Sequence, residues 1–381
     1  MRIAQLTLNW YSNYGNFLQK YALHKTLKHF ADEVEVLWSG NCEFLPETGK
    51  DKLYQIVRPH DSEERQNIYL LREAVRQSKF KDFENLHIKT RFDFPYLEDI
   101  ADEYDFFVVG SDNIWNPNQP NDKYFLNFVP REKKISYAVS VRPFTTTPTE
   151  EIRQIFRKGI LGFSHLSIRE EVTSKVVQEI TGVTPVSVLD PIFLLNFEEW
   201  DKVAQKPTWL NEKYQRGYVL TYYLRRLPPP EVKTLAAELD LPVINLLDIE
   251  NYNHFTVGPA EFIWLFKNAS LIFANSFHAI AFAILFRRPF INRVFKSDKH
   301  GISLAHRLLN VLSIFGLEDR RTFDEKVFTA EEAMKIDFTR RDEVLPIERA
   351  KAFTFLSKAL IKEAKTATIN SGGGVNSLNF P

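Results

Sequence analysis

Short apolar runs alternate along the chain with longer segments in which apolar residues recur at helical spacing. Such alternation is typical of β-α units that build a parallel sheet. In the first half the predicted strands are 3–8, 34–38, 104–109, 134–140, 166–168 and 186–189, and the predicted helices are 17–30, 61–83, 149–161 and 170–180. This half is therefore expected to form one doubly wound α/β domain.

The periodicity is lost between residues 193 and 217, where Pro207 and several polar residues interrupt it. We therefore place a domain boundary near residue 200. Beyond it the alternation resumes, with predicted strands 218–223, 243–246, 270–274 and 290–293 and predicted helices 231–239, 259–267, 277–286 and 302–315.

The sequence thus predicts an α/β protein with two Rossmann-like, doubly wound domains that face a cleft, over residues 1–200 and 201–345. A C-terminal helix over 346–365 is expected to lie back over the first domain. A flexible tail is expected over 366–381, where large apolar residues are few.

Composition narrows the class of protein further. The 381 residues are 44% hydrophobic, which suffices for sizeable cores, and 49 basic residues balance 49 acidic ones. This balance argues against nucleic acid as a partner. The only cysteine is Cys42, so an internal disulfide is excluded. No signal peptide or transmembrane stretch is visible, and we expect a cytoplasmic protein.

His278 is the most informative polar residue, because it opens an otherwise apolar helix directly after a strand. Open α/β sheets bind ligands at this edge, outside the carboxyl ends of their strands. Ser276 is a plausible N-cap, and the helix dipole is expected to favour an anion and to lower the pKa of His278. A buried or capping histidine without chemical function is the simpler alternative.

Polar clusters follow other predicted strands in the same way. The residues that we single out as candidates are Asn13, Tyr14, Gly15 and Asn16 after the first strand, Ser111, Asp112, Asn113 and Trp115 after the third, and Arg169 and Asp190 after later ones. Amide and carboxylate groups beside an aromatic ring are typical of sugar sites, and arginine binds carboxylate or phosphate at two points. Ordinary turns, an inward-facing indole and local ion pairs are the alternatives.

Basic residues near strand ends of the second half could bind an anionic substrate, although solvated surface pairs are the usual role of Arg-Arg doublets. They are Arg225, Arg226, Arg287, Arg288 and Arg293, with His300, His306 and Arg307 ranked below His278. We find no metal-ligand spacing, phosphate-binding loop or nucleophile elbow, and therefore predict neither a metal nor a cofactor.

Taken together, these segments resemble the polysaccharide pyruvyl transferase family. The matching stretches are NYGNFLQKYAL (13–23), VVGSDNIWNP (108–117), KISYAVS (134–140), LSIREE (166–171), VLDPIFLL (188–195) and NSFHAIAFAILFRRPFI (275–291).

The resemblance implies a fold similar to GT-B glycosyltransferases and transfer of a pyruvyl group from phosphoenolpyruvate to a sugar of a bacterial surface polysaccharide, as a cyclic ketal. It implies a catalytic role for His278 and donor-binding roles for Arg169 and Ser276. The loop residues Asn13, Tyr14, Asn16, Ser111, Asp112, Asn113 and Trp115 become candidates for the acceptor, with Gly15 and Asp190 as supporting residues.

Two departures from the family pattern change the expected site. Many members carry Arg before the histidine and Gly after it, where this chain has Phe277 and Ala279. Arg287, Arg288 or Arg293 would then have to bind the donor. Val141 and Arg142 also replace a Phe-Gly pair, which would bring Arg142 toward the donor or simply alter a turn.

The expected partners are phosphoenolpyruvate and a sugar acceptor, which a lipid could carry at the inner face of the membrane. Two other functions stay open, because a fold does not determine chemistry. One is a glycosyltransferase that uses a nucleotide sugar, and the other is a non-catalytic carbohydrate-binding protein.

Overall fold

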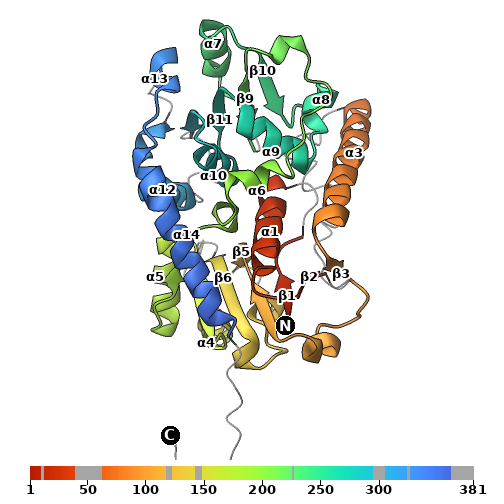
Figure 1. Ribbon diagram of the computed structural model, residues 1–381, viewed down its shortest axis with the longest axis vertical. Helices are drawn as coiled ribbons and strands as arrows, with labels where there is room; N and C mark the ends of the chain where they lie inside the picture. Colours follow the sequence, from red (N-terminus) through yellow and green to blue (C-terminus); the bar gives the residue numbers. More distant parts are fainter. Residues whose placement is uncertain are drawn as a thin grey trace, which may run out of the picture.

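The computed structural model describes residues 1–9, 13–38, 62–116, 122–141, 148–224, 227–294, 305–323 and 327–361. Two α/β halves lie one above the other along the long axis of the molecule (Figure 1). The predicted fold class, two Rossmann-like halves with parallel sheets, is confirmed.

The N-terminal half contains, within the described residues, an eight-stranded sheet with the order β3-β2-β1-β4-β6-β7-β8 and with β5 paired to β6. All these pairs are parallel. The strands are β1 (Arg2–Leu6), β2 (Glu33–Leu37), β3 (Thr90–Arg91), β4 (Phe106–Val109), β5 (Asp112–Trp115), β6 (Lys134–Val141), β7 (His165–Ile168) and β8 (Val186–Ser187). Its helices are α1 (Tyr14–Leu27), α3 (Glu63–His87), α4 (Glu150–Leu161) and α5 (Glu171–Thr181).

The C-terminal half contains, within the described residues, a five-stranded parallel sheet with the order β10-β9-β11-β12-β13. The strands are β9 (Val219–Tyr222), β10 (Val243–Leu246), β11 (Leu271–Ala274), β12 (Phe290–Arg293) and β13 (Arg321–Thr322). The remaining helices are α6 (Phe197–Asp201), α7 (Glu231–Glu238), α8 (Tyr252–Phe255), α9 (Pro259–Asn268), α10 (Phe277–Leu285), α12 (Ala305–Phe315), α13 (Ala330–Met334) and α14 (Thr339–Ala359). The predicted boundary near residue 200 falls in α6, between the two sheets.

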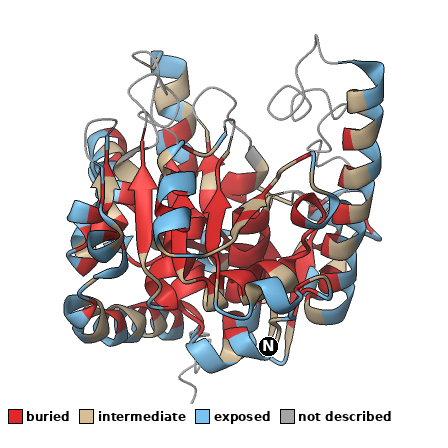
Figure 2. Ribbon diagram, turned by 90° about the horizontal axis from the view of Figure 1, so that it is seen from above, coloured by how far each residue is buried: buried red, intermediate tan, exposed pale blue. Residues whose placement is uncertain are grey.

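Most strands lie at the centre of the molecule and are buried, while exposed residues concentrate on the outer faces of the helices (Figure 2). The short edge strands β3 and β8 are more accessible. One hydrophobic core joins the two halves, because residues of α1 and α3 pack with residues of α9 and α10. The ring of Tyr14 stacks on Phe262 at 4.4 Å between centroids, and its hydroxyl donates to the carbonyl of Val257. The two halves are therefore held together by apolar contact near α1.

Helix α14 returns to the N-terminal half and covers the sheet there (Figure 1). Ala352 and Leu356 pack with Ile3, Val34 and Val108 in a single core cluster. The prediction that the C-terminal helix lies back over the first half is confirmed, but its expected start at residue 346 is wrong. The helix begins at Thr339 and continues through a proline at position 346.

Helix α1 also begins earlier than predicted, at Tyr14 instead of residue 17. Asn13 is its N-cap, and the side-chain oxygen of Asn13 accepts a hydrogen bond from the amide of Asn16 at 3.2 Å. An Asn in this place replaces one of the hydrogen bonds that a helix N-terminus lacks. Gly15 and Asn16 thus belong to the first turn of a helix and not to a loop.

Candidate functional site

His278 lies where the two halves meet, in the first turn of α10 directly after β11. The predicted strand and helix around it are confirmed, and Ser276 is the N-cap, although its side chain makes no capping bond. The imidazole packs against α1 of the other half. A Cβ at Gly15 would lie 2.0 Å from Nδ1 of His278, so only glycine leaves room for the ring.

Asp190 faces the other side of this imidazole. It follows β8, and its Oδ1 accepts a hydrogen bond from the amide of Ile192 at 3.0 Å. Its Oδ2 lies 2.6 Å from Nη1 of Arg169 and 3.7 Å from Nε2 of His278. Burial alone would raise the pKa of Asp190, but these two contacts outweigh it and hold the pKa below its usual value. Asp190 is therefore a carboxylate that orients both the arginine and the histidine.

Arg169 extends from the end of β7 into the same buried space. Its Nε donates to Glu170 at 2.6 Å, and its guanidinium lies 4.5 Å from the centre of the Phe277 ring. Burial opposes its charge, but Glu170, Asp190 and Asp112 raise the pKa of Arg169 above its usual value. The side chain therefore stays a cation, and Phe277 packs on it as a cation-π partner.

Asp112 brings a further carboxylate to the site from the start of β5. Its φ of 69° lies in the left-handed region, which Asp tolerates better than most residues. Its Oδ2 accepts a hydrogen bond from Asn16 at 3.1 Å, and its Oδ1 accepts one from Nη1 of Arg307 at 3.2 Å. Burial would raise the pKa of Asp112, but Arg307 and Arg169 hold it far below its usual value.

Several polar atoms of this cluster are buried and lack a hydrogen-bond partner among the described residues: Nε2 of His278, Nη2 of Arg169, Nε of Arg307 and Oδ1 of Asn16. Buried polar groups normally have partners, so such a concentration calls for an explanation. Two guanidinium groups and an imidazole that converge in this way can bind an anion and exchange a proton with it.

The structure thus gathers, from the two halves, seven of the residues singled out from the sequence. They are Asn13, Gly15, Asn16, Asp112, Arg169, Asp190 and His278. Ser276 and the half-buried Asn113 lie beside them, and Asn113 accepts a hydrogen bond from Ser140 at 3.1 Å.

Three predicted acceptor residues are structural. Trp115 is fully buried, stacks on Phe125 and donates from its indole nitrogen to the carbonyl of Tyr124 at 3.1 Å, so it presents no face to a sugar. Tyr14 belongs to the core between the halves. Ser111 is fully buried, and its hydroxyl donates to the carbonyl of Ala138 at 2.7 Å and lies 3.5 Å from Oδ2 of Asp190, which it helps to hold in place.

Arg287, Arg288 and Arg293, the predicted donor-binding arginines, are not part of the cluster around His278 in this structure. Arg287 and Arg288 follow the C-terminal end of α10, whereas His278 lies at its N-terminal end. Arg287 forms an exposed ion pair with Asp342. Arg293 is buried in an ion pair with Glu231 on α7. The residues Arg142, Arg225, Arg226 and His300 and the tail 366–381 lie outside the described residues.

Arg307 also belongs to this cluster, through its hydrogen bond to Asp112. The sequence places it on or before a helix that could face the cleft, and ranks it below His278. Its position facing Asp112 depends on how the two halves meet. Gln19 on α1 was missed altogether, and it accepts a hydrogen bond from the backbone amide of Ser111 at 3.1 Å, which holds the loop before Asp112.

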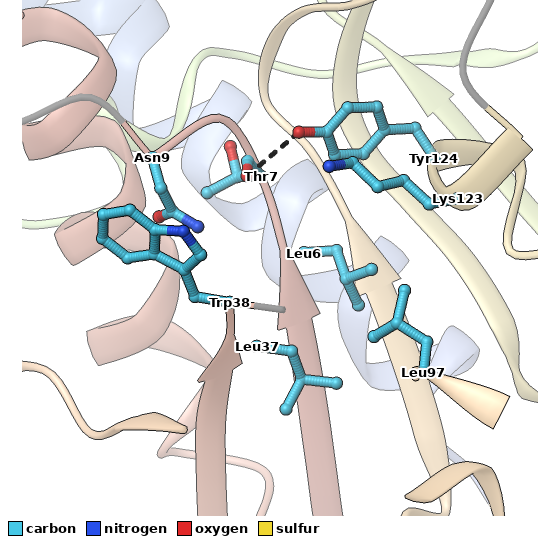
Figure 3. Close-up of a pocket in the computed structure, with 8 residues that line it drawn as sticks. All are labelled: Leu6, Thr7, Asn9, Leu37, Trp38, Leu97, Lys123 and Tyr124. Carbon is cyan, nitrogen blue, oxygen red and sulfur yellow. Dashed lines mark hydrogen bonds between the residues drawn. The ribbon is translucent and has the colours of Figure 1, made fainter. Parts of the chain in front are cut away.

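Two hollows among the described residues lie outside the cluster. One is a crevice of about 10 Å³ at the carboxyl ends of β1 and β2, where Asn9 lies against Trp38 and the hydroxyl of Tyr124 donates to the carbonyl of Thr7 (Figure 3). It holds about one water molecule. The other, of about 550 Å³, lies between α4, β7 and α14, around Phe163 and Phe355.

Fold and site together define a two-domain α/β protein whose reactive groups lie between Rossmann-like halves. The family model described as polysaccharide pyruvyl transferase matches residues 13–293, and the chain belongs to this family. Membership of this family supports a pyruvyl transferase role in polysaccharide biosynthesis. No curated protein matches the chain.

Solved structures resemble the chain only distantly. UDP-GlcNAc 2-epimerase from Neisseria meningitidis is 9% identical with a TM-score of 0.45, and the match covers 94% of this chain and all of the other. A variant of the wall teichoic acid polymerase TagF is 12% identical with a TM-score of 0.43, over 94% and 83% of the two chains. The E. coli ADP-heptose heptosyltransferase II is 12% identical with a TM-score of 0.33, over 92% and 99%.

Two further observations concern the described residues alone. None of their helices is both long and apolar enough to cross a membrane. They also contain no cluster of three or more His, Cys, Asp or Glu side chains that could hold a metal ion.

Proposed function

We propose that this protein transfers the pyruvyl group of phosphoenolpyruvate to two hydroxyls of one sugar and forms a cyclic pyruvate ketal in a bacterial surface polysaccharide. The observation that carries the proposal is the buried cluster of His278, Asp190 and Arg169, which lies inside the segment matched by the family model. The cluster combines a proton-transfer group with a fixed cation.

The reaction needs one proton at the methylene carbon of phosphoenolpyruvate and two sugar oxygens at the neighbouring carbon. Protonation turns the methylene into the methyl group, and the first hydroxyl adds to the adjacent carbon and loses its proton. The bond from that carbon to the phosphate oxygen then breaks, and the second hydroxyl adds. One hydroxyl proton ends on the methyl group and the other on the released phosphate, so the reaction needs no redox partner or cofactor.

His278 is the general acid or base in this scheme, because an imidazole gives and takes protons near neutral pH. Asp190 orients its ring and stabilises the imidazolium. Arg169 holds the anionic donor and stabilises the charge that develops as phosphate leaves. Asn13, Asn113 and Ser276 remain candidates for contacts with sugar or donor.

The acceptor is proposed to be a sugar chain, which can be carried by a lipid, and the place of action the cytoplasm or the inner face of the membrane. A transient contact with the membrane surface would then deliver the acceptor. The assay described next identifies the acceptor sugar.

The test is incubation of the protein with phosphoenolpyruvate and a panel of hexose glycosides, with phosphate release and the mass of the product as readouts. We expect phosphate and a ketal in equal amounts. His278→Asn should abolish both, while His254→Asn, at a similarly buried histidine on α8, should keep the activity of the folded protein. Near-full activity of His278→Asn would refute the assignment.

Calorimetry with phosphoenolpyruvate and with UDP-sugars separates the proposal from a glycosyltransferase function. Binding of phosphoenolpyruvate alone supports the proposal. Binding of a UDP-sugar alone overturns it, and binding of sugar without phosphate release favours a non-catalytic carbohydrate-binding protein.

A further inference from the structure

Arg307 crosses from one half of the molecule to the other. It lies on α12 of the C-terminal half, yet its Nη1 donates to Oδ1 of Asp112 in the N-terminal half at 3.2 Å. Its side chain is only 11% exposed. Residue 307 also lies beyond the segment matched by the family model, so the family assignment gives it no role.

The hydrogen bonding of this guanidinium is incomplete. Its Nε is buried and has no partner among the described residues. The same holds for Nη2 of Arg169, which lies 3.8 Å from the same Oδ1 of Asp112, beyond hydrogen-bond distance. Because both arginines contact one oxygen atom, a single small anion at that place can contact both of them.

The carboxylate of Asp112 does not satisfy all the donors around it, because its Oδ1 already accepts hydrogen bonds from the backbone amide of Asn113 at 2.8 Å and from Nη1 of Arg307 at 3.2 Å. Nη1 of Arg307, Nδ2 of Asn16 and Nη2 of Arg169 approach it from three different elements, and the third stays too far for a hydrogen bond. A phosphoryl group has three terminal oxygens and so offers one acceptor to each of these donors. The carboxylate of Asp112 has two oxygens, and one of them is also occupied by the amide of Asn113.

We propose that Arg307 binds the phosphoryl group of the donor together with Arg169, and that Asp112 occupies this place in the structure as a competing carboxylate. Arg307 thus supplies the cation that the position of Phe277 lacks. This inference rests on the proposed function for the identity of the donor, but the oxyanion site itself does not.

The proposal is tested by calorimetry with inorganic phosphate, phosphoenolpyruvate and pyruvate. Charge-assisted hydrogen bonds are strong enough that Arg307→Gln should weaken binding of phosphate and phosphoenolpyruvate roughly 10- to 100-fold. Arg307→Lys keeps the charge and should recover part of the loss. Arg320→Gln, at another buried arginine of the C-terminal half, is the matched control and should leave binding unchanged.

The change in phosphate affinity on substitution of Asp112 shows whether its carboxylate competes with the donor or supports its binding. Asp112→Asn removes the competing charge, so phosphate should bind more tightly. Weaker binding of phosphate would overturn the idea that Asp112 competes with the donor. Thermal unfolding of each variant shows whether it is folded, and if Arg307→Gln does not fold, the Lys and Asp112→Asn variants decide the question.

The outcomes distinguish this inference from the proposed function. If phosphate and phosphoenolpyruvate bind Arg307→Gln as tightly as the wild type, the inference fails and the proposed function stands. If phosphate binds through Arg307 but phosphoenolpyruvate does not bind at all, the site stands and the proposed function fails. If Arg307→Gln loses pyruvate binding but binds phosphate as the wild type does, the assignment of Arg307 to the phosphoryl group is wrong. If the wild type binds neither phosphate nor phosphoenolpyruvate, both the inference and the proposed function are wrong.

Discussion

The contact between Gly15 and His278 gives the sharpest prediction about the site. A methyl group at position 15 would lie 2.0 Å from Nδ1, 2.3 Å from Cγ and 2.7 Å from Cβ of His278. Ordinary contacts between such atoms are longer than 3.4 Å, so in Gly15→Ala the imidazole must move by more than an ångström. A displacement of about 1 Å at a reacting group costs on the order of 100-fold in rate. We expect a loss of kcat for pyruvyl transfer of at least that size.

The stability of Gly15→Ala should change much less than its activity. Overpacking costs roughly 1–3 kcal/mol, while Ala in place of Gly in a helix gains up to about 1 kcal/mol. The net loss in the free energy of unfolding is therefore about 0–3 kcal/mol, which urea denaturation measures. Gly159→Ala on α4 is the matched control, because the added Cβ would lie 2.3 Å from the ring of Phe125, away from the site. It should lose similar stability and keep its activity per folded molecule.

A double variant checks that the clash is with His278 itself. In the His278→Gly background all three crowded atoms are gone, so Gly15→Ala should become neutral or stabilising. The reasoning is refuted if Gly15→Ala retains the activity of Gly159→Ala, or if the same destabilisation persists in the His278→Gly background.

Further expectations concern the neighbouring residues. The folded-state pKa of both Asp112 and Asp190 is lowered, so their contribution to stability is complete at neutral pH and is lost as the pH falls below about 4. The free energy of unfolding of Asp112→Asn should therefore fall less steeply in acid than that of the wild type. Equal slopes against pH, measured by urea denaturation, would contradict this. Trp115→Phe should cost about 1–3 kcal/mol through its lost core contacts and hydrogen bond, with an unchanged KM for the sugar acceptor; a raised KM would restore Trp115 to the site. Arg287→Ala breaks an exposed ion pair far from His278, so activity should stay within about twofold and the free energy of unfolding within about 1 kcal/mol of the wild type. A large rise in the KM for the donor would show that Arg287 reaches the site.

The sequence predicted which residues converge where one strand and the next helix determine a position. His278, Arg169, Asp112 and Asp190 all follow strands, and parallel strands end at one edge of a sheet. The same argument indicates that Arg287 and Arg288 lie away from this edge of the sheet. The nine residues of α10 rise about 1.5 Å each, which carries the chain roughly 14 Å away to the opposite edge.

The sequence-based predictions were wrong where tertiary contacts determine the position of a side chain. Trp115 follows the sheet's third buried strand, but the segment from Asp112 forms a further strand beside β6, and this pairing turns the indole into the core. Tyr14 was assigned to a polar loop, and the partner that draws it into a helix, Phe262, belongs to the other half. Local pattern contains no information about such contacts.

Helix α14 has a consequence for the order in which the protein can fold. The sheet of the N-terminal half is made of the residues synthesised first, but Ile3, Val34 and Val108 are covered by Ala352 and Leu356. During translation this apolar face stays open until the whole C-terminal half has been made. A fragment of residues 1–200 should therefore be prone to aggregation on its own, and adding a peptide of residues 339–361 should restore its solubility.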